Sequence, residues 1–116
     1  MESAKAPTVL SVTTTVASLP DAQRLARLLL ERRLAACVQI EPGLSSHYVW
    51  QGRPCEEAEV RLTIKTLPGR VAALEALFAE QHPYELPQFL ATGMQASAAY
   101  AAWVSESVAS DPDPPA

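Results

Sequence analysis

The chain has 116 residues, of which 48% are hydrophobic and 19% are charged, and its formal net charge is −4. This length suits one domain, and no apolar run approaches the roughly 20 residues that span a bilayer, so we expect a water-soluble protein without a membrane partner. Because phosphate binding needs clustered lysine and arginine, the acidic balance argues against a nucleic-acid partner.

The two ends of the chain differ in composition from its middle. Residues 1–8 lack the continuous apolar stretch of a secretory signal, which predicts a cytoplasmic protein that starts with a short disordered arm. Residues 110–116 combine serine, aspartate and proline and have no apolar side chain to pack, which predicts a disordered tail. We therefore place the folded domain at residues 9–109.

The start of the domain predicts a strand followed by a helix. Residues 9–16 alternate with the two-residue period of a half-buried strand. Ser18 can cap the next helix, and Pro20 suits its first turn. Apolar residues then recur at helical spacing, and we expect the helix to end near Leu34. The apolar stripe consists of Ala22, Leu25, Ala26 and Leu29.

The middle of the domain predicts three strands separated by two turns. The first strand covers residues 35–41 and ends at the Pro-Gly pair of residues 42–43, whose backbone preferences suit a tight turn. The second covers the aromatic residues 46–51, so a hairpin should join these two strands. The third covers residues 59–66 and alternates apolar with charged side chains, which predicts one dry and one polar face.

The last part of the domain predicts a helix, a strand and a final helix. An amphipathic helix ends at about Gln81, with Pro68 in its first turn, and two prolines keep residues 82–87 out of it. Residues 89–94 form a short apolar strand, and residues 100–108 have helical spacing.

This order predicts the α+β class, as a ferredoxin-like βαββαβ sandwich with an additional C-terminal helix. Two helices would cover the apolar face of a mainly antiparallel sheet. The polar face would carry Thr13, Thr15, Glu59, Arg61, Thr63 and Lys65. Exposed aromatic residues and unpaired strand edges seldom stay uncovered, so we expect subunits to associate through this face and these edges.

Six motifs resemble the CutA divalent-cation tolerance proteins in order and spacing. They are Leu34-Ala35-Ala36-Cys37-Val38, Pro42-Gly43, Tyr48-Val49-Trp50-Gln51-Gly52, Glu59-Val60 with Lys65-Thr66, His82-Pro83-Tyr84-Glu85-Leu86-Pro87, and Tyr100-Ala-Ala-Trp103. The resemblance covers roughly residues 9–108. It implies a tight homotrimer related in architecture to the PII signalling proteins, with a cytoplasmic role linked to copper or other divalent metals and no established enzymatic activity.

The resemblance breaks down at the copper ligands. In the best-described bacterial members, copper is associated with a Cys on the first strand, a His directly before the His-Pro-Tyr motif, and a Glu directly after its second proline. These positions hold Thr14, Gln81 and Gln88 here. A hydroxyl and two neutral amides are poor copper ligands, so we assign no metal site, and copper or another divalent cation stays a suggestion of the resemblance alone.

The histidines and cysteines each allow two interpretations. His82 could be a metal ligand or pocket residue of the family motif, but we favour a cation at a helix end that bonds the last carbonyls. Cys37 could bind a soft metal, but we favour a small core hydrophobe. Cys55 follows a predicted turn, and we favour incidental exposure for it. For His47 we favour a surface or interface residue.

The charged row on the 59–66 strand also has two interpretations. Glu59 and Lys65 are six residues apart, so they point to the same side of the sheet, with Arg61 between them. They could form a pocket between subunits for a small anion or a metal complex, with Tyr84 and Trp50 at its rim. We favour interfacial or solvated ion pairs that fix the subunit register. The ligand-binding set under the first interpretation is Glu59, Lys65, His82, Tyr84 and Trp50.

Two functions follow. The chain has no nucleophile elbow, P-loop or dinucleotide motif and holds only 4 glycines, so an enzyme has little support. The favoured function is a non-enzymatic homotrimer for divalent-cation tolerance. The alternative is a PII-like trimer that senses a small molecule or anion in clefts between subunits through Lys65, Glu59 and Tyr84, although residues 41–45 look too short for the mobile loop of a PII-like regulator.

Overall fold

The computed structural model describes residues 8–109, which form four strands and three α-helices. In chain order they are β1 (Thr8–Val16), α1 (Leu19–Glu31), β2 (Cys37–Trp50), β3 (Arg53–Thr66), α2 (Val71–Gln81), β4 (Leu90–Gln95) and α3 (Ala98–Val108), with a 3₁₀ turn η1 (Pro68–Arg70) before α2. The predicted disordered arm and tail lie outside the described residues, except for Thr8, which belongs to β1 instead of the arm.

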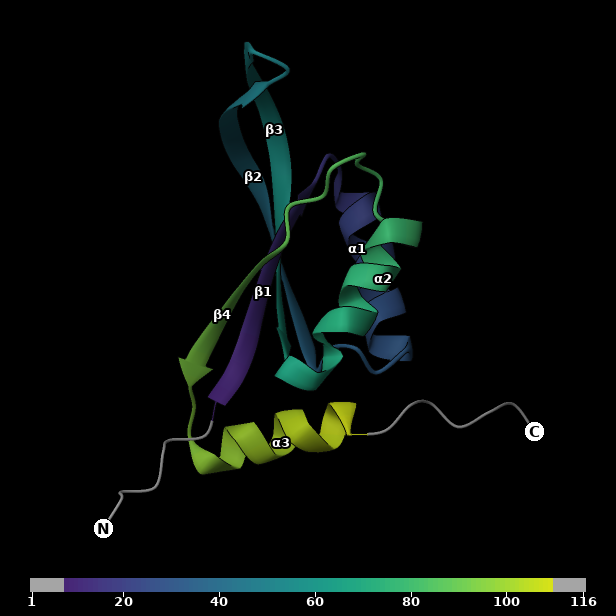
Figure 1. The fold of residues 1–116 in the computed structure, drawn as a ribbon, viewed down its shortest axis with the longest axis vertical. Helices are drawn as coiled ribbons and strands as arrows, with labels where there is room; N and C mark the ends of the chain where they lie inside the picture. Colours follow the sequence, from purple (N-terminus) through teal and green to yellow (C-terminus); the bar gives the residue numbers. More distant parts are fainter. Residues whose placement is uncertain (1–7, 110–116) are drawn as a thin grey trace, which may run out of the picture.

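The sheet has the strand order β2-β3-β1-β4, and all its neighbouring strands are antiparallel. Helices α1 and α2 lie side by side on one face of this sheet, and α3 crosses near one end of it (Figure 1). The predicted α+β, ferredoxin-like sandwich with an additional C-terminal helix is therefore confirmed. No helix among the residues described is long and apolar enough to cross a membrane.

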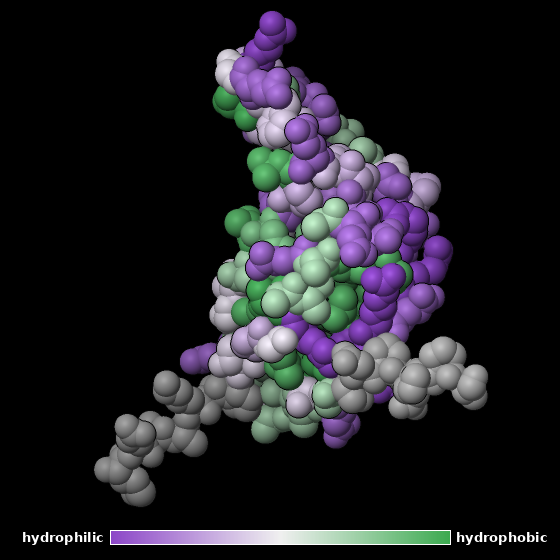
Figure 2. Space-filling model, turned by 45° about the vertical axis from the view of Figure 1, so that its right-hand side comes forward, coloured by the Kyte–Doolittle hydropathy of each residue, from purple (hydrophilic) through white to green (hydrophobic). Residues whose placement is uncertain are grey.

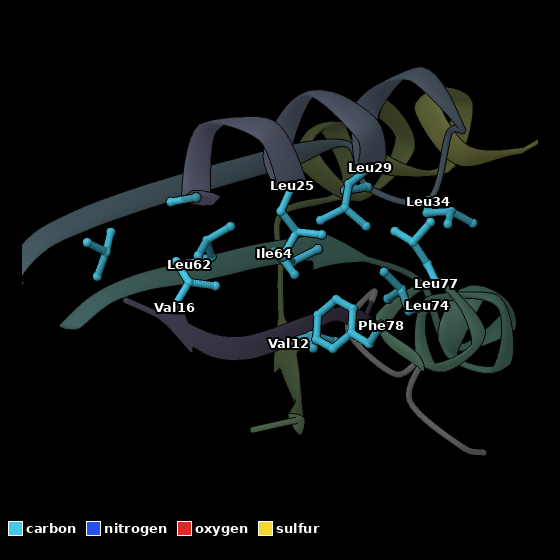
Figure 3. Close-up of a cluster of buried hydrophobic side chains, with 13 residues drawn as sticks. Val12, Val16, Leu25, Leu29, Leu34, Leu62, Ile64, Leu74, Leu77 and Phe78 are labelled. Atoms are coloured by element: carbon cyan, nitrogen blue, oxygen red, sulfur yellow. The ribbon is translucent and has the colours of Figure 1, made fainter. Parts of the chain in front are cut away.

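The hydrophobic core lies between the sheet and the helices α1 and α2 (Figure 3). Val12 of β1 and Ile64 of β3 are partners in the sheet, and they belong to the same buried cluster as Leu29 of α1 and Phe78 of α2. All four side chains are 3% exposed or less. Full burial of one such side chain stabilises the fold by about 1.5–3 kcal/mol. The periodicity predicted for these four elements therefore identified the core face correctly.

The region between α1 and α2 differs from the prediction. It forms two long strands instead of three short ones, and the predicted turn at residues 42–43 is wrong. The register shifts between Glu41 and Leu44, and Gly43 has φ 83°, so this point is a bulge within β2. The turn lies at Gln51 and Gly52, whose φ angles of 52° and 77° are typical of a two-residue type I′ hairpin.

The outer half of this hairpin, residues 44–59, is here called the β-ribbon. It projects well beyond the helices and away from the rest of the sheet (Figure 1). The space-filling view shows a hydrophilic tip with hydrophobic residues just below it (Figure 2). The β2–β3 connection is the two-residue turn at Gln51 and Gly52, and paired strands lead up to it, so the structure has a regular ribbon where a PII-like regulator would have a long mobile loop.

The helix ends follow the local sequence. The Ser18 Oγ accepts the Asp21 N–H at 3.2 Å, which confirms the predicted cap of α1. This helix ends at Glu31, three residues before the predicted end, and Arg33 follows with φ 53°. At the other end of the chain, Val108 of α3 is buried, and its carbonyl accepts hydrogen bonds from the Arg70 guanidinium.

Candidate functional site

An open cleft of about 860 Å³ lies between the β-ribbon and residues 83–88, which connect α2 to β4. The ribbon forms one wall because its bulge and turn extend β2 and β3 beyond the core. Two prolines keep residues 83–88 out of α2, and this segment forms the other wall. The lining consists of Thr15, Ser46, His47, Tyr48, Trp50, Glu57, Glu59, Pro83, Tyr84, Glu85, Leu86, Pro87 and Gln88.

A buried carboxylate and a tyrosine join the two walls. Glu59, at the base of the β-ribbon, is 8% exposed, and the Tyr84 hydroxyl donates to its Oε2 at 2.6 Å. Burial raises the pKa of the Tyr84 phenol, and the Glu59 carboxylate raises it further, so the hydroxyl keeps its proton at neutral pH. Among residues 8–109 the ion pairs are His47–Glu56 and Arg61–Glu41, so Glu59 is buried without a cationic partner.

His82 holds the start of the second wall in place. Its Nδ1 accepts the Tyr84 main-chain N–H at 3.1 Å, and its Nε2 lies 2.9 Å from the Thr14 Oγ1. Since Nδ1 accepts a hydrogen bond, the proton is on Nε2, which donates to Thr14. Burial lowers the pKa of His82 and favours this neutral form. The expected charged His82 that bonds the last helix carbonyls is therefore wrong, because both ring nitrogens have other partners.

Aromatic side chains line the ribbon wall of the cleft. Tyr48 and Trp50 lie on β2 and are 38% and 39% exposed. Burial and a hydrogen bond to Glu57 raise the pKa of the Tyr48 phenol. His47 lies at the outer edge of the cleft, where its Nε2 is 3.1 Å from the Ser45 hydroxyl and 3.8 Å from the Glu56 carboxylate. Its position on the exposed ribbon agrees with the expected surface residue.

Lys65 does not reach the cleft within one chain. It lies on the same face of β3 as Glu59 but near the opposite end of the strand, and its Nζ donates to the Gln39 Oε1 at 3.0 Å. Arg61, between them, pairs with Glu41 at 3.0 Å. The row therefore contains one ion pair and one amide contact, while Glu59 is joined to Tyr84.

The two cysteines are free and half-buried. Cys37 faces away from the core, because its neighbour Val38 is the one that packs against the core residues. The core interpretation of Cys37 is therefore wrong, and the cause is that the strand register places it opposite Lys65 on the polar face. Cys55 lies on the β-ribbon opposite Tyr48, with its Sγ 3.7 Å from a main-chain carbonyl.

The three positions of the family copper ligands have other roles here. Thr14 is fully buried and bonds His82, and Gln81 accepts hydrogen bonds from Arg24 through its main-chain and side-chain oxygens at 2.8 and 3.4 Å. Gln88 lines the cleft. Within the described part of the chain, no group of three His, Cys, Asp or Glu side chains could hold a metal ion. This donor set does not fit copper.

Two acidic residues of the cleft were missed in the sequence. Glu57 lies beside Glu59 on the ribbon wall, and Glu85 follows Tyr84 on the other wall. The signal for Glu57 was the turn: a two-residue hairpin at residues 51–52 pairs Ser46 with Glu57 and so brings it beside the aromatic strand. No sequence signal placed Glu85 opposite the ribbon.

Comparisons with known proteins agree with this architecture. The sequence model of the CutA1 divalent ion tolerance protein family matches residues 10–107. The divalent-cation tolerance protein CutA of Pectobacterium atrosepticum is 40% identical over 75% of this chain and 80% of its own length. The protein of that name from Thermus thermophilus is 39% identical over 79% of this chain and 90% of its own length.

A solved structure extends the likeness to three dimensions. CutA from Synechococcus elongatus superposes with a TM-score of 0.84 at 36% identity, over 90% of this chain and 94% of that one. The chain spans about half the length of the mammalian relatives that it matches. Because the family match covers nearly all of the folded domain and the structure has the same architecture, the chain belongs to the CutA1 divalent ion tolerance protein family.

Proposed function

We propose that the chain is a non-enzymatic, cytoplasmic homotrimer that acts in divalent-cation tolerance without the three-ligand copper site of its bacterial relatives. The observation that carries the tolerance role is the family match over residues 10–107. The chemistry of Thr14, Gln81 and Gln88 supports the loss of the copper site, because all three offer neutral oxygen or amide groups in place of thiolate, imidazole and carboxylate.

The shape of one subunit supports the trimer. Its radius of gyration is 15.9 Å, against about 13 Å for a compact domain of about 100 residues, because the β-ribbon projects from the body. A two-stranded ribbon is marginally stable alone in water. Apolar side chains outside the cleft are also left exposed, including Val49 at 71%, Leu90 at 59% and Met94 at 46%. The β2 and β4 edges have unpaired main-chain groups, and a second subunit could cover them.

Light scattering and a growth assay test this proposal separately. Light scattering of the purified full-length chain should give the mass of three chains, and a monomer at micromolar concentration would overturn the trimer. The growth assay expresses the chain in a bacterium that lacks its own CutA protein and measures growth in copper-rich medium. Restored growth supports the tolerance role, and growth equal to that of the empty-vector strain contradicts it.

The second candidate is a small-molecule binding protein of the PII-like kind, and the cleft beside the β-ribbon favours it. A cleft of this size suits a small ligand, and Glu59 and Tyr84 supply polar groups that could orient it. The expected use of Lys65 for an anion has no support within one chain, because that side chain bonds Gln39 instead. The charge of the cleft therefore decides which ligand is possible.

A further inference from the structure

We infer that the cleft between the β-ribbon and residues 83–88 binds a small organic cation, an ammonium or guanidinium group on an apolar body. This inference rests on the second candidate function, small-molecule binding, and is independent of the metal-tolerance role.

The charge of the lining is the first argument. Three carboxylates line the cleft, from Glu57, Glu59 and Glu85, whereas no lysine or arginine of residues 8–109 of the same chain does. An anion would meet like charges on both walls, which disfavours it strongly. A cation would instead find opposite charges on both the ribbon wall and the facing segment.

The burial of Glu59 is the second argument. A largely buried carboxylate without a cation is costly, and Glu59 is 8% exposed with a hydrogen bond from Tyr84 to its Oε2. An ionised carboxylate has about four acceptor sites, and Tyr84 fills one of them. The remaining sites leave negative charge facing the cleft, and this charge attracts the positive charge of an ammonium or guanidinium group that enters it.

The aromatic rings are the third argument, because they separate an organic cation from a metal ion. Tyr48, Trp50 and Tyr84 all line the cleft, and the faces of such rings attract organic cations. Within residues 8–109 no group of three His, Cys, Asp or Glu side chains could hold a metal ion, and Glu57 and Glu59 line one wall of the cleft whereas Glu85 lines the other. A divalent ion needs its oxygen ligands within about 2.6 Å, whereas an extended cation can contact separated charges.

The decisive experiment compares two probes of equal shape and different charge. Choline and 3,3-dimethylbutan-1-ol differ by the replacement of a quaternary nitrogen with carbon, and inorganic phosphate serves as the anion. Each is titrated into the full-length Trp103→Phe protein, so that Trp50 fluorescence reports on the cleft, and calorimetry confirms the binding. We expect choline to bind at least about tenfold more tightly than the neutral alcohol, and phosphate not to bind.

Variants connect the binding to the proposed residues. Glu59→Gln should weaken choline binding about tenfold or more, whereas Glu80→Gln, which removes an exposed carboxylate from α2 outside the cleft, should leave it unchanged. Circular dichroism and light scattering check that each variant folds and assembles. If Glu59→Gln does not fold, calorimetry on Trp50→Leu replaces it, because loss of the exposed ring should weaken choline binding without removing a buried group.

The outcomes separate this inference from the function on which it rests. Equal binding of choline and the alcohol overturns the inference that the ligand is an organic cation. Unchanged choline binding in Glu59→Gln and Trp50→Leu overturns it as well. Binding of phosphate in preference to choline keeps the small-molecule function and overturns the cation as its ligand. Failure of all three probes at millimolar concentration overturns the inference and removes the support for small-molecule binding at this cleft.

Discussion

Acidification should loosen the wall of the cleft that carries Tyr84, because it places a charge on His82. The His82 side chain is 8% exposed, and its Nδ1 accepts the Tyr84 main-chain N–H at 3.1 Å. Protonation of Nδ1 would set two N–H donors against each other and break this hydrogen bond. The hydrogen bond from Nε2 to Thr14 would remain, so the predicted loss is specific to the segment that follows α2.

The direction of the pKa shift fixes the sign of the effect. Burial lowers the pKa of His82 and Arg24 acts with it, while a main-chain hydrogen bond at Thr15 opposes them. Since the folded-state pKa lies below the unfolded value of about 6.5, the unfolded chain binds the proton first. The free energy of unfolding should therefore fall below about pH 6.5, by up to about 1.4 kcal/mol per pH unit, and level off below the folded-state pKa.

Urea unfolding at several pH values and one fixed protein concentration measures this slope. The chain has 2 histidines, so two variants separate their contributions. His82→Gln should lose the part of the slope that lies just below about pH 6.5, and His47→Gln, which changes the exposed histidine of the β-ribbon, should keep it. Equal slopes for His82→Gln and the parent protein would refute the assignment of a buried, neutral His82.

Three further predictions concern the cleft, the core and the ribbon turn. Tyr84→Phe should lower the free energy of unfolding by about 1.5–3 kcal/mol, because it removes the donor to a buried carboxylate. The loss should be smaller in a Glu59→Gln background, and equal losses in both backgrounds, measured by urea unfolding, would contradict the Tyr84–Glu59 hydrogen bond. Leu29→Ala should lower the free energy of unfolding by about 2–5 kcal/mol in the same assay, since this side chain is 0% exposed. Leu30→Ala, whose parent side chain is 47% exposed, should change it by no more than about 0.5 kcal/mol, and equal losses in the two variants would contradict the assignment of the core. Gln51→Asn should raise the melting temperature, because asparagine tolerates the positive φ of 52° better than glutamine does, and a lower value would contradict the turn assignment.

The core and the order of its elements could be predicted because they depend on local period. Residues 60–65 alternate cleanly, and their apolar members are the ones buried in β3. The α1 stripe follows the helical period, and Ser18 marks its start. Each of these signals lies within one element, so no knowledge of its partners was needed.

The β-ribbon was missed because its sequence carries weak and misleading signals. A glycine with positive φ serves a bulge as well as a turn, so Gly43 gave the same local pattern as the end of a strand. Residues 53–58 are polar or exposed for most of their length and show no apolar face. Without the ribbon, Glu57 could not be placed beside Tyr48, and the cleft could not be predicted.

The central claim of this account is that a member of the CutA1 family has kept the fold and lost the copper ligands. Calorimetric titration of the full-length protein with Cu²⁺ tests it most directly. The matched control is the triple variant Thr14→Cys, Gln81→His, Gln88→Glu, which restores the three residue types found at these positions in the best-described bacterial members. We predict no stoichiometric binding to the unmodified chain and clear binding to the triple variant, whereas stoichiometric binding to the unmodified chain at micromolar affinity or tighter would contradict the claim.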